Sequence, residues 1–230
     1  MKYDVRNVSE LENKLNIVFS DKTLLVAAIT HSSYANQKKD VVYNERLEFL
    51  GDSVLQLVIT EYLYRNYKDK SEGELTKVRS LIVCENSLYE IALTWNLGKY
   101  IFMSKGEELT GGRQRISIQA DCVEAIIAAI YLDKGFETVK EFIINVFSLI
   151  IEKANKNQII LDYKTKLQEL LQKNGEVSIN YSLDKYEGPP HRRKFFVSVF
   201  VNEEVIGKGE GFSKKEAEQM AAKYALMRME

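Results

Sequence analysis

One segment, residues 118–132, limits the fold of this chain more than any other. It runs IQADCVEAIIAAIYL and is apolar on nearly every face of a helix, and a helix of that kind is buried. Asp121 and Glu124 nevertheless lie one turn apart inside it, and the segment holds no basic residue to pair with them. Burying an ionised carboxylate costs several kcal/mol unless it is paired or bound to a metal. The two acids are therefore either helix-start residues stabilised by the helix dipole or part of a metal site.

A second group of acids lies in the segment Asn44–Ile59, NERLEFLGDSVLQLVI. At about 100° per residue, Glu45, Glu48 and Asp52 fall within an arc of roughly 60°. Five apolar residues fall on the opposite side: Leu47, Leu50, Val54, Leu57 and Val58. One interpretation is a solvated acidic face. The other joins both groups into a hard, all-oxygen site that suits Mg²⁺.

The composition places the chain among ordinary globular proteins. Hydrophobic residues make up 45% and charged residues 28% of the 230 positions, and there are only two prolines, which favours helix. No run of about 18 apolar residues and no signal peptide is present, so we expect no membrane partner. Two isolated cysteines favour reduced thiols in a cytoplasm. The net charge of −1 means that any nucleic-acid surface must come from local clustering.

Periodicity divides the chain into a helical part and a mixed tail. Helical patterns occupy Ser9–Leu15, Asp21–Thr30, Asn44–Tyr67, Glu72–Asn96, Ile118–Leu132 and Glu137–Ile151. The polar residues from Lys153 onward predict a linker. In the tail, a helix over Asp162–Lys173 precedes three strands, at Val177–Leu183, Lys194–Val201 and Glu204–Glu210. Ser213 and Glu216 then form a capping box that opens a last helix through Met227, giving the order α-β-β-β-α.

These segments also carry a family resemblance. NERLEFLGDSVL resembles the signature helix of ribonuclease III, and THSSY, EGELTKVRSLIV and ADCVEAIIAAIYLD match further segments of that family in order. The tail is similar to a double-stranded RNA-binding domain through DYKTKLQE, EGPPHRRKFFV and GFSKKEAEQMAA. The resemblance covers essentially the whole chain. It implies a mainly α protein, with an all-α nuclease domain at 1–152, a linker at 153–160 and the α-β-β-β-α RNA-binding domain at 161–230.

The resemblance also implies the catalytic residues. Glu48, Asp52, Asp121 and Glu124 would ligate Mg²⁺, with Mn²⁺ as the alternative ion, and orient the attacking water. Glu45 would play a supporting role near the substrate. Two positions depart from the family pattern, and we expect both to alter the surroundings of the metal ligands: Ile116 and Gln119. No organic cofactor is expected.

The implied activity is Mg²⁺-dependent cleavage of double-stranded RNA to 5′-phosphate and 3′-hydroxyl ends with short 3′ overhangs. A homodimer formed through the nuclease domain would cut both strands, in the processing of ribosomal RNA precursors and of other structured transcripts, including messenger and transfer RNA. The alternative is a non-catalytic double-stranded RNA-binding regulator on the same scaffold. The complete set of four acids favours the enzyme, because a scaffold has no need of unpaired acids in a buried helix.

Two other functions fit the sequence less well. A two-histidine ribonuclease would need His31 and His191 together, but they lie in different predicted domains. We expect His31 to be a structural hydrogen-bonding residue. A helical metal-storage or redox protein would carry Glu-x-x-His pairs, which this sequence lacks.

Recognition of A-form RNA depends on its shape, its phosphates and its 2′-hydroxyls. Three pieces of the tail suit these groups, and free helix N-terminal N–H groups with nearby lysines suit phosphate. The predicted RNA-binding residues are Thr165, Gln168, Glu169 and Gln172 on the first helix, His191 and Arg192 in the loop, and Ser213, Lys214 and Lys215 at the start of the last helix. In the nuclease half, we expect the basic loop Gly111–Arg115 to touch RNA.

Overall fold

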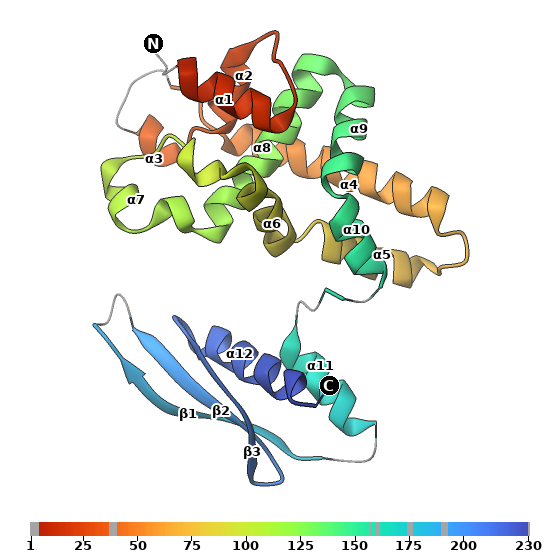
Figure 1. The fold of residues 1–230 in the computed structure, drawn as a ribbon, viewed down its shortest axis with the longest axis vertical. Helices are drawn as coiled ribbons and strands as arrows, with labels where there is room; N and C mark the ends of the chain where they lie inside the picture. Colours follow the sequence, from red (N-terminus) through yellow and green to blue (C-terminus); the bar gives the residue numbers. More distant parts are fainter. Residues whose placement is uncertain are drawn as a thin grey trace. The chain divides into compact units, whose positions relative to one another are not determined.

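The structure is a computed structural model that describes residues 5–36, 41–156, 158–159, 162–173, 177–189 and 193–229. The chain forms two compact units, Met1–Gln158 and Ile159–Glu230. The first is helical, and the second combines two helices with a three-stranded sheet (Figure 1). The predicted fold class is confirmed. The domain boundaries set at residues 152 and 161 stay a prediction.

Short helices of the first unit surround two long ones, α4 and α8. The helices are α1 (Val5–Leu15), α2 (Lys22–Ala28), α3 (Ser32–Ala35), α4 (Glu45–Asn66), α5 (Glu72–Ile82), α6 (Glu85–Trp95), α7 (Lys105–Leu109), α8 (Ile116–Lys134), α9 (Phe136–Val146) and α10 (Ser148–Asn155), with 3₁₀ turns η1 (Leu97–Lys99) and η2 (Gly112–Gln114). Among the described residues of this unit, β-structure is confined to one isolated bridge between Thr30 and Phe102.

Two of the predicted helical stretches are each split into two helices. The stretch Glu72–Asn96 breaks at Val83 and Cys84, where no glycine or proline marks an interruption. The Ser87 hydroxyl donates to the Leu81 carbonyl oxygen at 2.7 Å and so satisfies a group that the end of α5 leaves free. The stretch Glu137–Ile151 breaks at Phe147, and α10 then continues through Asn155, which makes the first three residues of the predicted linker helical.

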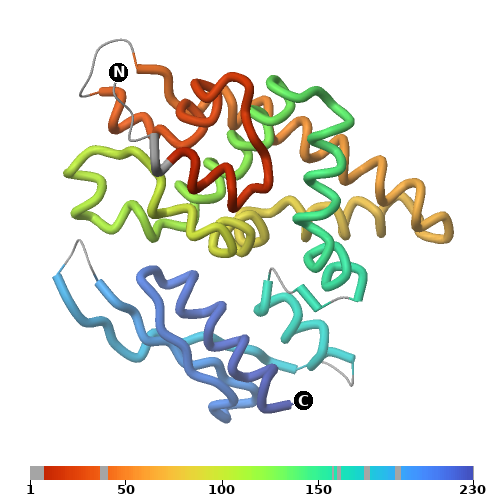
Figure 2. The backbone as a smooth tube through the Cα atoms, turned by 45° about the horizontal axis from the view of Figure 1, so that its top comes forward, coloured from red at the N-terminus to blue at the C-terminus, as the bar shows by residue number. Residues whose placement is uncertain are grey.

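Helix α8 forms the centre of the first unit. It packs against α2, α4, α6 and α9, and Figures 1 and 2 show it in the interior of the helical unit. Six consecutive residues, Ala125 to Ile130, are completely inaccessible to solvent. Since all directions around the helix are covered over this stretch, the apolar sequence is explained by burial, as predicted.

The backbones of α4 and α8 approach each other closely at Gly51. A Cβ atom built on Gly51 would lie 1.8 Å from the carbonyl oxygen of Glu124, far inside van der Waals contact. Only glycine lets the two helices cross at this separation. Because Asp52 follows Gly51 directly, the crossing brings an acid of α4 next to an acid of α8.

The exposed face of α4 differs from the prediction. Its buried side is centred on Gly51, Val54, Leu55 and Val58. Leu57, which we assigned to the apolar side, is instead 57% exposed. The packed side is rotated toward the acids because the contact with α8 forms at Gly51. Glu48 and Asp52 consequently lie at the edge of the packed side and are half-buried, so they do not form a fully solvated acidic face.

The second unit is a small sheet covered on one face by helices. Its elements are α11 (Tyr163–Gln172), β1 (Ile179–Glu187), β2 (Lys194–Val201), β3 (Glu204–Gly211) and α12 (Lys214–Met227). The strands are antiparallel in the order β1-β2-β3. Strand β1 extends four residues beyond the predicted alternation, in a stretch that is exposed throughout.

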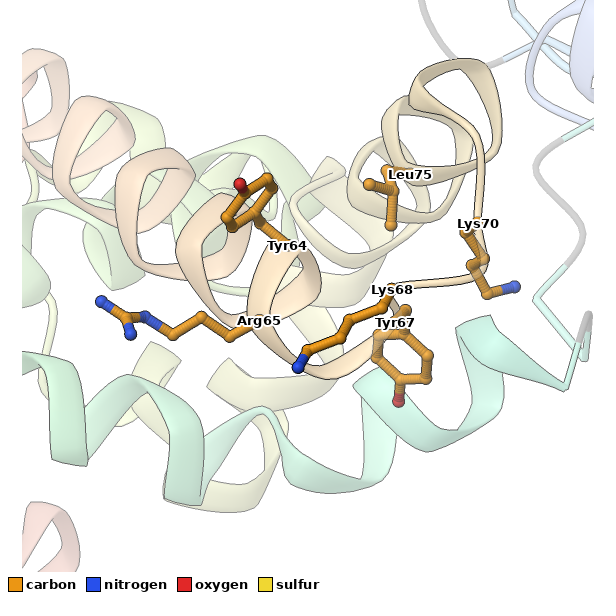
Figure 3. A pocket seen from close by; sticks show the side chains of 6 residues that line it. All are labelled: Tyr64, Arg65, Tyr67, Lys68, Lys70 and Leu75. Carbon is orange, nitrogen blue, oxygen red and sulfur yellow. The ribbon is translucent and has the colours of Figure 1, made fainter.

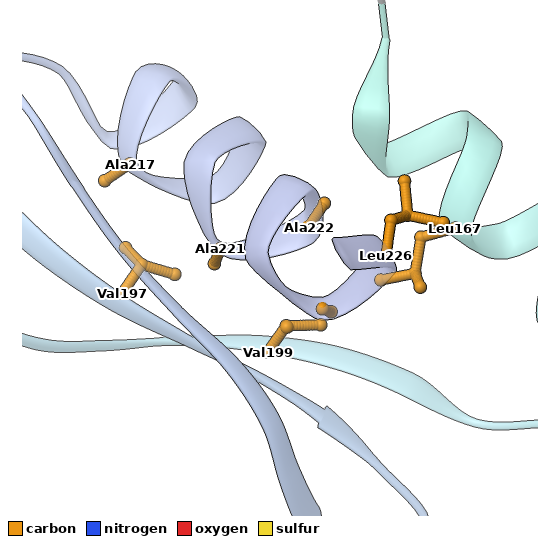
Figure 4. Close-up of a cluster of buried hydrophobic side chains, with 8 residues drawn as sticks. Leu167, Val197, Val199, Ala217, Ala221, Ala222 and Leu226 are labelled. Carbon is orange, nitrogen blue, oxygen red and sulfur yellow. The ribbon is translucent and has the colours of Figure 1, made fainter. Parts of the chain in front are cut away.

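Small residues bring α12 close to the sheet. Gly207 and Gly209 of β3 face α12, and a Cβ atom on Gly209 would lie 2.1 Å from the backbone nitrogen of Ala221. The helix presents alanines at successive turns, and these join Leu167 of α11 and Val197 and Val199 of β2 in one buried cluster (Figure 4). The glycines and alanines thus replace side-chain bulk with close backbone packing.

The predicted cap of α12 is present with one difference. The Ser213 hydroxyl accepts the backbone N–H of Glu216 at 3.1 Å. The Glu216 carboxylate accepts the N–H of Phe212 rather than that of Ser213. The side chains of Ser213 and Glu216 therefore both hold the start of α12 in place.

The α4–α8 crossing predicts the effect of Gly51→Ala. Alanine favours helix by about 1 kcal/mol, but the added Cβ overlaps the Glu124 backbone and forces the helices apart. We expect a net loss of unfolding free energy of about 2 kcal/mol, in the range of overpacked cores. Urea unfolding followed by circular dichroism measures it.

Gly73→Ala is the matched control, because Gly73 also lies within a helix but its added Cβ would meet no atom within 4 Å. This variant should be more stable than the wild type by about 0.5–1 kcal/mol. Equal effects of the two substitutions would contradict the account of the crossing.

Candidate active site

The two acidic groups meet where α4 crosses α8. Glu48 and Asp52 lie one turn apart on α4, and Asp121 and Glu124 lie one turn apart on α8. All four are half-buried. Glu45, one turn before Glu48, is exposed at the start of α4. The structure thus brings together the four predicted ligands and leaves Glu45 at the rim.

The electrostatics of the cluster are those of uncompensated negative charge. Burial, followed by repulsion from Asp52, Glu48 and Asp121, raises the pKa of Glu124 to about 8. Burial and then Asp121, Glu45 and Asp52 raise the pKa of Glu48. Glu124 therefore senses all three of the other acids, and at neutral pH it retains its proton for most of the time.

Asp121 has a slightly different environment. Burial raises its pKa, with a further contribution from Glu85 at the start of α6, while His31 acts in the opposite direction. Elsewhere in the unit acids have basic partners, as Glu61 has in Lys140 and Arg65. Within the described ranges, none of the four central acids forms an ion pair with lysine or arginine.

The oxygen atoms of the four acids are ligands that suit a hard cation, but their side chains do not converge on one point. Over the described residues, no three His, Cys, Asp or Glu side chains are arranged to hold a metal ion. Carboxylate oxygens without competing lysines are the ligands that Mg²⁺ and related hard ions prefer.

Several neutral contacts hold the surroundings of the acids. The Gln56 side-chain amide donates to both carboxylate oxygens of Asp52, each at 2.9 Å. Asn44, just before α4, donates from its backbone N–H to the Thr30 carbonyl oxygen at 2.9 Å and from its side chain to the Cys122 sulfur at 3.6 Å. The two contacts of Asn44 connect the start of α4 to Thr30, next to His31, and to Cys122 of α8, next to Asp121.

His31 has a structural role, as expected. It precedes α3 as its N-cap, and its Nδ1 accepts the backbone N–H of Ser33 at 3.3 Å and lies 2.8 Å from the Ser33 hydroxyl. Ser33 in turn accepts the N–H of Ser104 at 3.1 Å. Nδ1 therefore acts as an acceptor, which leaves the other ring nitrogen as the donor in the neutral form.

The described RNA-binding candidates of the second unit are all exposed. Thr165, Gln168, Glu169 and Gln172 lie along one face of α11, and Ser213, Lys214 and Lys215 lie at the N-terminus of α12. The Thr165 hydroxyl is not free, since it donates to the Asp162 carboxylate at 2.9 Å. His191 and Arg192 lie outside the described residues.

Comparison with known proteins decides the family. Residues 21–150 match the model of the family described as ribonuclease-III-like, and residues 163–229 match the double-stranded RNA binding motif. The chain is 68% identical over 222 residues to "Ribonuclease 3" of Clostridium botulinum strain Eklund 17B, covering 96% of each chain. It is 65% identical over 223 residues to "Ribonuclease 3" of Clostridium perfringens, covering 97% of this chain and 94% of the relative. The chain belongs to the ribonuclease III family.

A solved structure agrees with this assignment. The nuclease domain of ribonuclease III from Campylobacter jejuni aligns with 62% of this chain and 96% of its own length, at 45% identity and a TM-score of 0.59. Ribonuclease III enzymes are metal-dependent endonucleases specific for double-stranded RNA, and this chain is one of them. The alternative of a non-catalytic regulator is therefore set aside. Among the described helices, none has the length and apolar character needed to span a membrane.

The expectation that the loop Gly111–Arg115 of the ribonuclease III nuclease unit touches RNA is modified by the contacts of its arginines. In the loop Gly111–Arg115, Arg113 pairs with Glu108 and Arg115 pairs with Glu107. Arg113 also donates to the carbonyl oxygens of Gly98 and Ile101 at 2.9 and 3.0 Å. These arginines hold the loop to its own unit, so their charge is largely neutralised before any RNA arrives.

The two departures from the family pattern lie on the first turn of α8. Gln119 is buried, and its amide donates to the Arg113 carbonyl oxygen at 2.7 Å. It therefore anchors the loop to α8 and does not contact an acid. Ile116 is 39% exposed at the first position of α8.

Three residues near the acids were missed by the sequence analysis: Gly51, Gln56 and Glu85. Gly51 had a visible signal, a glycine in the middle of a long helix, which marks close packing. Gln56 lies one turn after Asp52, so its contact also follows from helical spacing. Glu85 had no such signal, because its proximity to Asp121 depends on how α6 packs against α8.

A separate cavity of about 520 Å³ lies at the C-terminal end of α4 (Figure 3). Its described lining is mainly aromatic and basic, and the residues are Tyr64, Arg65, Tyr67, Lys68, Lys70 and Leu75. None of these is a ligand for a hard cation. The cavity is therefore distinct from the acidic cluster.

The raised pKa of Glu124 predicts a pH dependence of stability in chelator. The folded protein holds this proton up to a pH of about 8, whereas the unfolded chain loses it near 4.5. The folded state thus binds more protons over this window, and stability falls as the pH rises through it. Glu124→Gln removes the effect, so its melting temperature should increasingly exceed that of the wild type between about pH 5 and 8. Parallel melting curves for the two proteins over this range would contradict the assignment.

Proposed function

We propose that Glu48, Asp52, Asp121 and Glu124 hold Mg²⁺ and that this site hydrolyses double-stranded RNA to 5′-phosphate and 3′-hydroxyl ends. The observation that carries the proposal is the crossing of α4 and α8 at Gly51, which brings four half-buried acids without a basic partner together, and burial with their mutual repulsion raises the pKa of Glu124. Such a site is unfavourable for the fold alone and becomes favourable when a divalent cation is bound. Mn²⁺, an ion of similar ligand preference, is proposed as a substitute.

The chemistry divides between the ion and the side chains. Mg²⁺ held by the four acids would neutralise charge on the phosphoryl oxygens and make water a better nucleophile. Glu124 must lose its proton to become a ligand, so binding of the ion is coupled to proton release. Asp52 enters the site already oriented by Gln56. Glu45, exposed one turn before Glu48, is proposed to support the substrate at the rim.

The second unit would select the substrate. The exposed face of α11 offers Gln168, Glu169 and Gln172 to 2′-hydroxyls, and Thr165 can join them while its hydroxyl donates to Asp162. At the start of α12, Lys214 and Lys215 carry no ion pair among the described residues and would meet phosphate. Ser213 holds the helix start in place through its bond to Glu216. Selection by backbone shape suits diverse structured transcripts, and we propose ribosomal RNA precursors in the cytoplasm as the main substrates.

A homodimer through the nuclease unit completes the proposal. Three large apolar or aromatic residues line the outer face of α4 and are strongly exposed: Phe49 at 78%, Leu57 at 57% and Tyr64 at 74%. Burying such side chains is favourable, and an exposed apolar patch marks an interaction surface. The Campylobacter jejuni structure is titled for flexibility in a region involved in dimer formation of its nuclease domain. Leu55, on the same helix, is fully buried within the subunit and takes no part in this surface.

The test of the catalytic assignment is Glu124→Gln. It removes one ligand charge but keeps the shape of the side chain, so cleavage of a labelled RNA duplex in Mg²⁺ should fall by several orders of magnitude. Duplex binding in chelator should be unchanged, because the binding groups lie in the second unit. Single-turnover cleavage and a gel-shift titration measure the two quantities.

Two further variants control for the loss of an acid elsewhere and for the loss of RNA binding. Glu90→Gln makes the same change at an exposed acid that pairs with Lys153, and its cleavage should stay within twofold of the wild type. The double variant Lys214→Ala, Lys215→Ala should show the inverse pattern, with weaker binding, a shallower salt dependence and cleavage that recovers at low salt. Cleavage by Glu124→Gln within tenfold of the wild type would remove Glu124 from the site.

A further inference from the structure

Asp52 differs from the other three acids in having a side-chain hydrogen-bond donor. Gln56 Nε2 lies 2.9 Å from each of its carboxylate oxygens. No other of the four acids accepts a side-chain hydrogen bond within the described part of the chain. Both residues are half-buried on α4, with Gln56 one turn after Asp52. The contact is therefore local to the helix and does not depend on any mobile segment.

The chemistry of the donor suits a metal ligand. A carboxylate has about four lone-pair positions, so an amide that occupies part of them leaves acceptor capacity for a cation. The amide is also neutral. A lysine or arginine at the same position would pair with Asp52 and cancel the charge that a cation needs, whereas glutamine orients the carboxylate and leaves its charge intact.

We propose that Gln56 is a positioning residue that holds the Asp52 carboxylate in the orientation required for binding Mg²⁺. The inference rests on the proposed metal site and adds a residue to it. Hydrogen bonds to a ligating carboxylate fix its rotamer, and loss of such a partner typically costs 10–100-fold in metal affinity or activity. Gln56 acts through Asp52 alone and takes no part in the chemical step.

The test compares Gln56→Met and Gln56→Ala with the wild type. Methionine keeps most of the side-chain length and removes both N–H donors, and alanine removes the side chain altogether. The readouts are the melting temperature in chelator, the Mg²⁺ concentration at half of the maximal thermal shift, and the Mg²⁺ concentration at half of the maximal cleavage rate. Ser53→Ala is the matched control, since Ser53 is exposed on the same helix and, among the described residues, its hydroxyl donates only to the Phe49 carbonyl oxygen.

Both Gln56 variants should raise the two Mg²⁺ midpoints about tenfold. Their cleavage rate at saturating Mg²⁺ should fall much less, and their melting temperature in chelator should equal that of Ser53→Ala. Midpoints within twofold of the wild type in Gln56→Met would overturn the inference.

Asp52→Asn separates this inference from the metal site itself. If Asp52→Asn abolishes the Mg²⁺ response while Gln56→Met leaves it unchanged, the role of Gln56 is wrong and the metal site stands. If the thermal response to Mg²⁺ survives unchanged in Asp52→Asn, then Asp52 is not a ligand, and both proposals fail at this residue.

Discussion

The close approach of two helix backbones at Gly51 and Glu124 underlies the whole nuclease unit. Without a side chain at position 51, α4 can cross α8 with a separation that any Cβ atom would prevent. The crossing places two acids of each helix in one half-buried cluster. It also rotates the packed side of α4 toward these acids and leaves Phe49, Leu57 and Tyr64 on the outer face. A single glycine thus sets the position of both the candidate metal ligands and the candidate dimer surface.

The cost of this arrangement is electrostatic. Burial disfavours the charged form of Glu124, and repulsion from Asp52, Glu48 and Asp121 adds to this effect, so Glu124 keeps its proton up to a pH of about 8. A folded protein that carries such a site gives up stability that a bound cation restores, a trade that is common at active sites. Gln56 donates to both carboxylate oxygens of Asp52 without supplying a competing positive charge.

Much of this organisation could be predicted from the sequence, for identifiable reasons. Helical spacing groups Glu48 with Asp52, and an apolar helix that contains Asp121 and Glu124 demands a partner for them. The strands and the cap of α12 follow from alternation and from Ser213. Other features depend on packing that no local pattern records. The break at Cys84 lacks a glycine or proline, and Leu57 becomes exposed only because α8 contacts α4 at Gly51. The ion pairs of Arg115 with Glu107 and of Arg113 with Glu108 follow no helical spacing and could be recognised only in the structure.

The central claim is that a divalent cation replaces a proton within the acidic cluster. Counting the protons released when Mg²⁺ binds at pH 7, by calorimetry in buffers of different ionisation enthalpy, measures this directly. With the pKa of Glu124 at about 8, the account predicts the release of about one proton per site from the wild type and almost none from Glu124→Gln. Binding of Mg²⁺ to the wild type without proton release would contradict it, because the four carboxylates would then be ionised before the cation arrives.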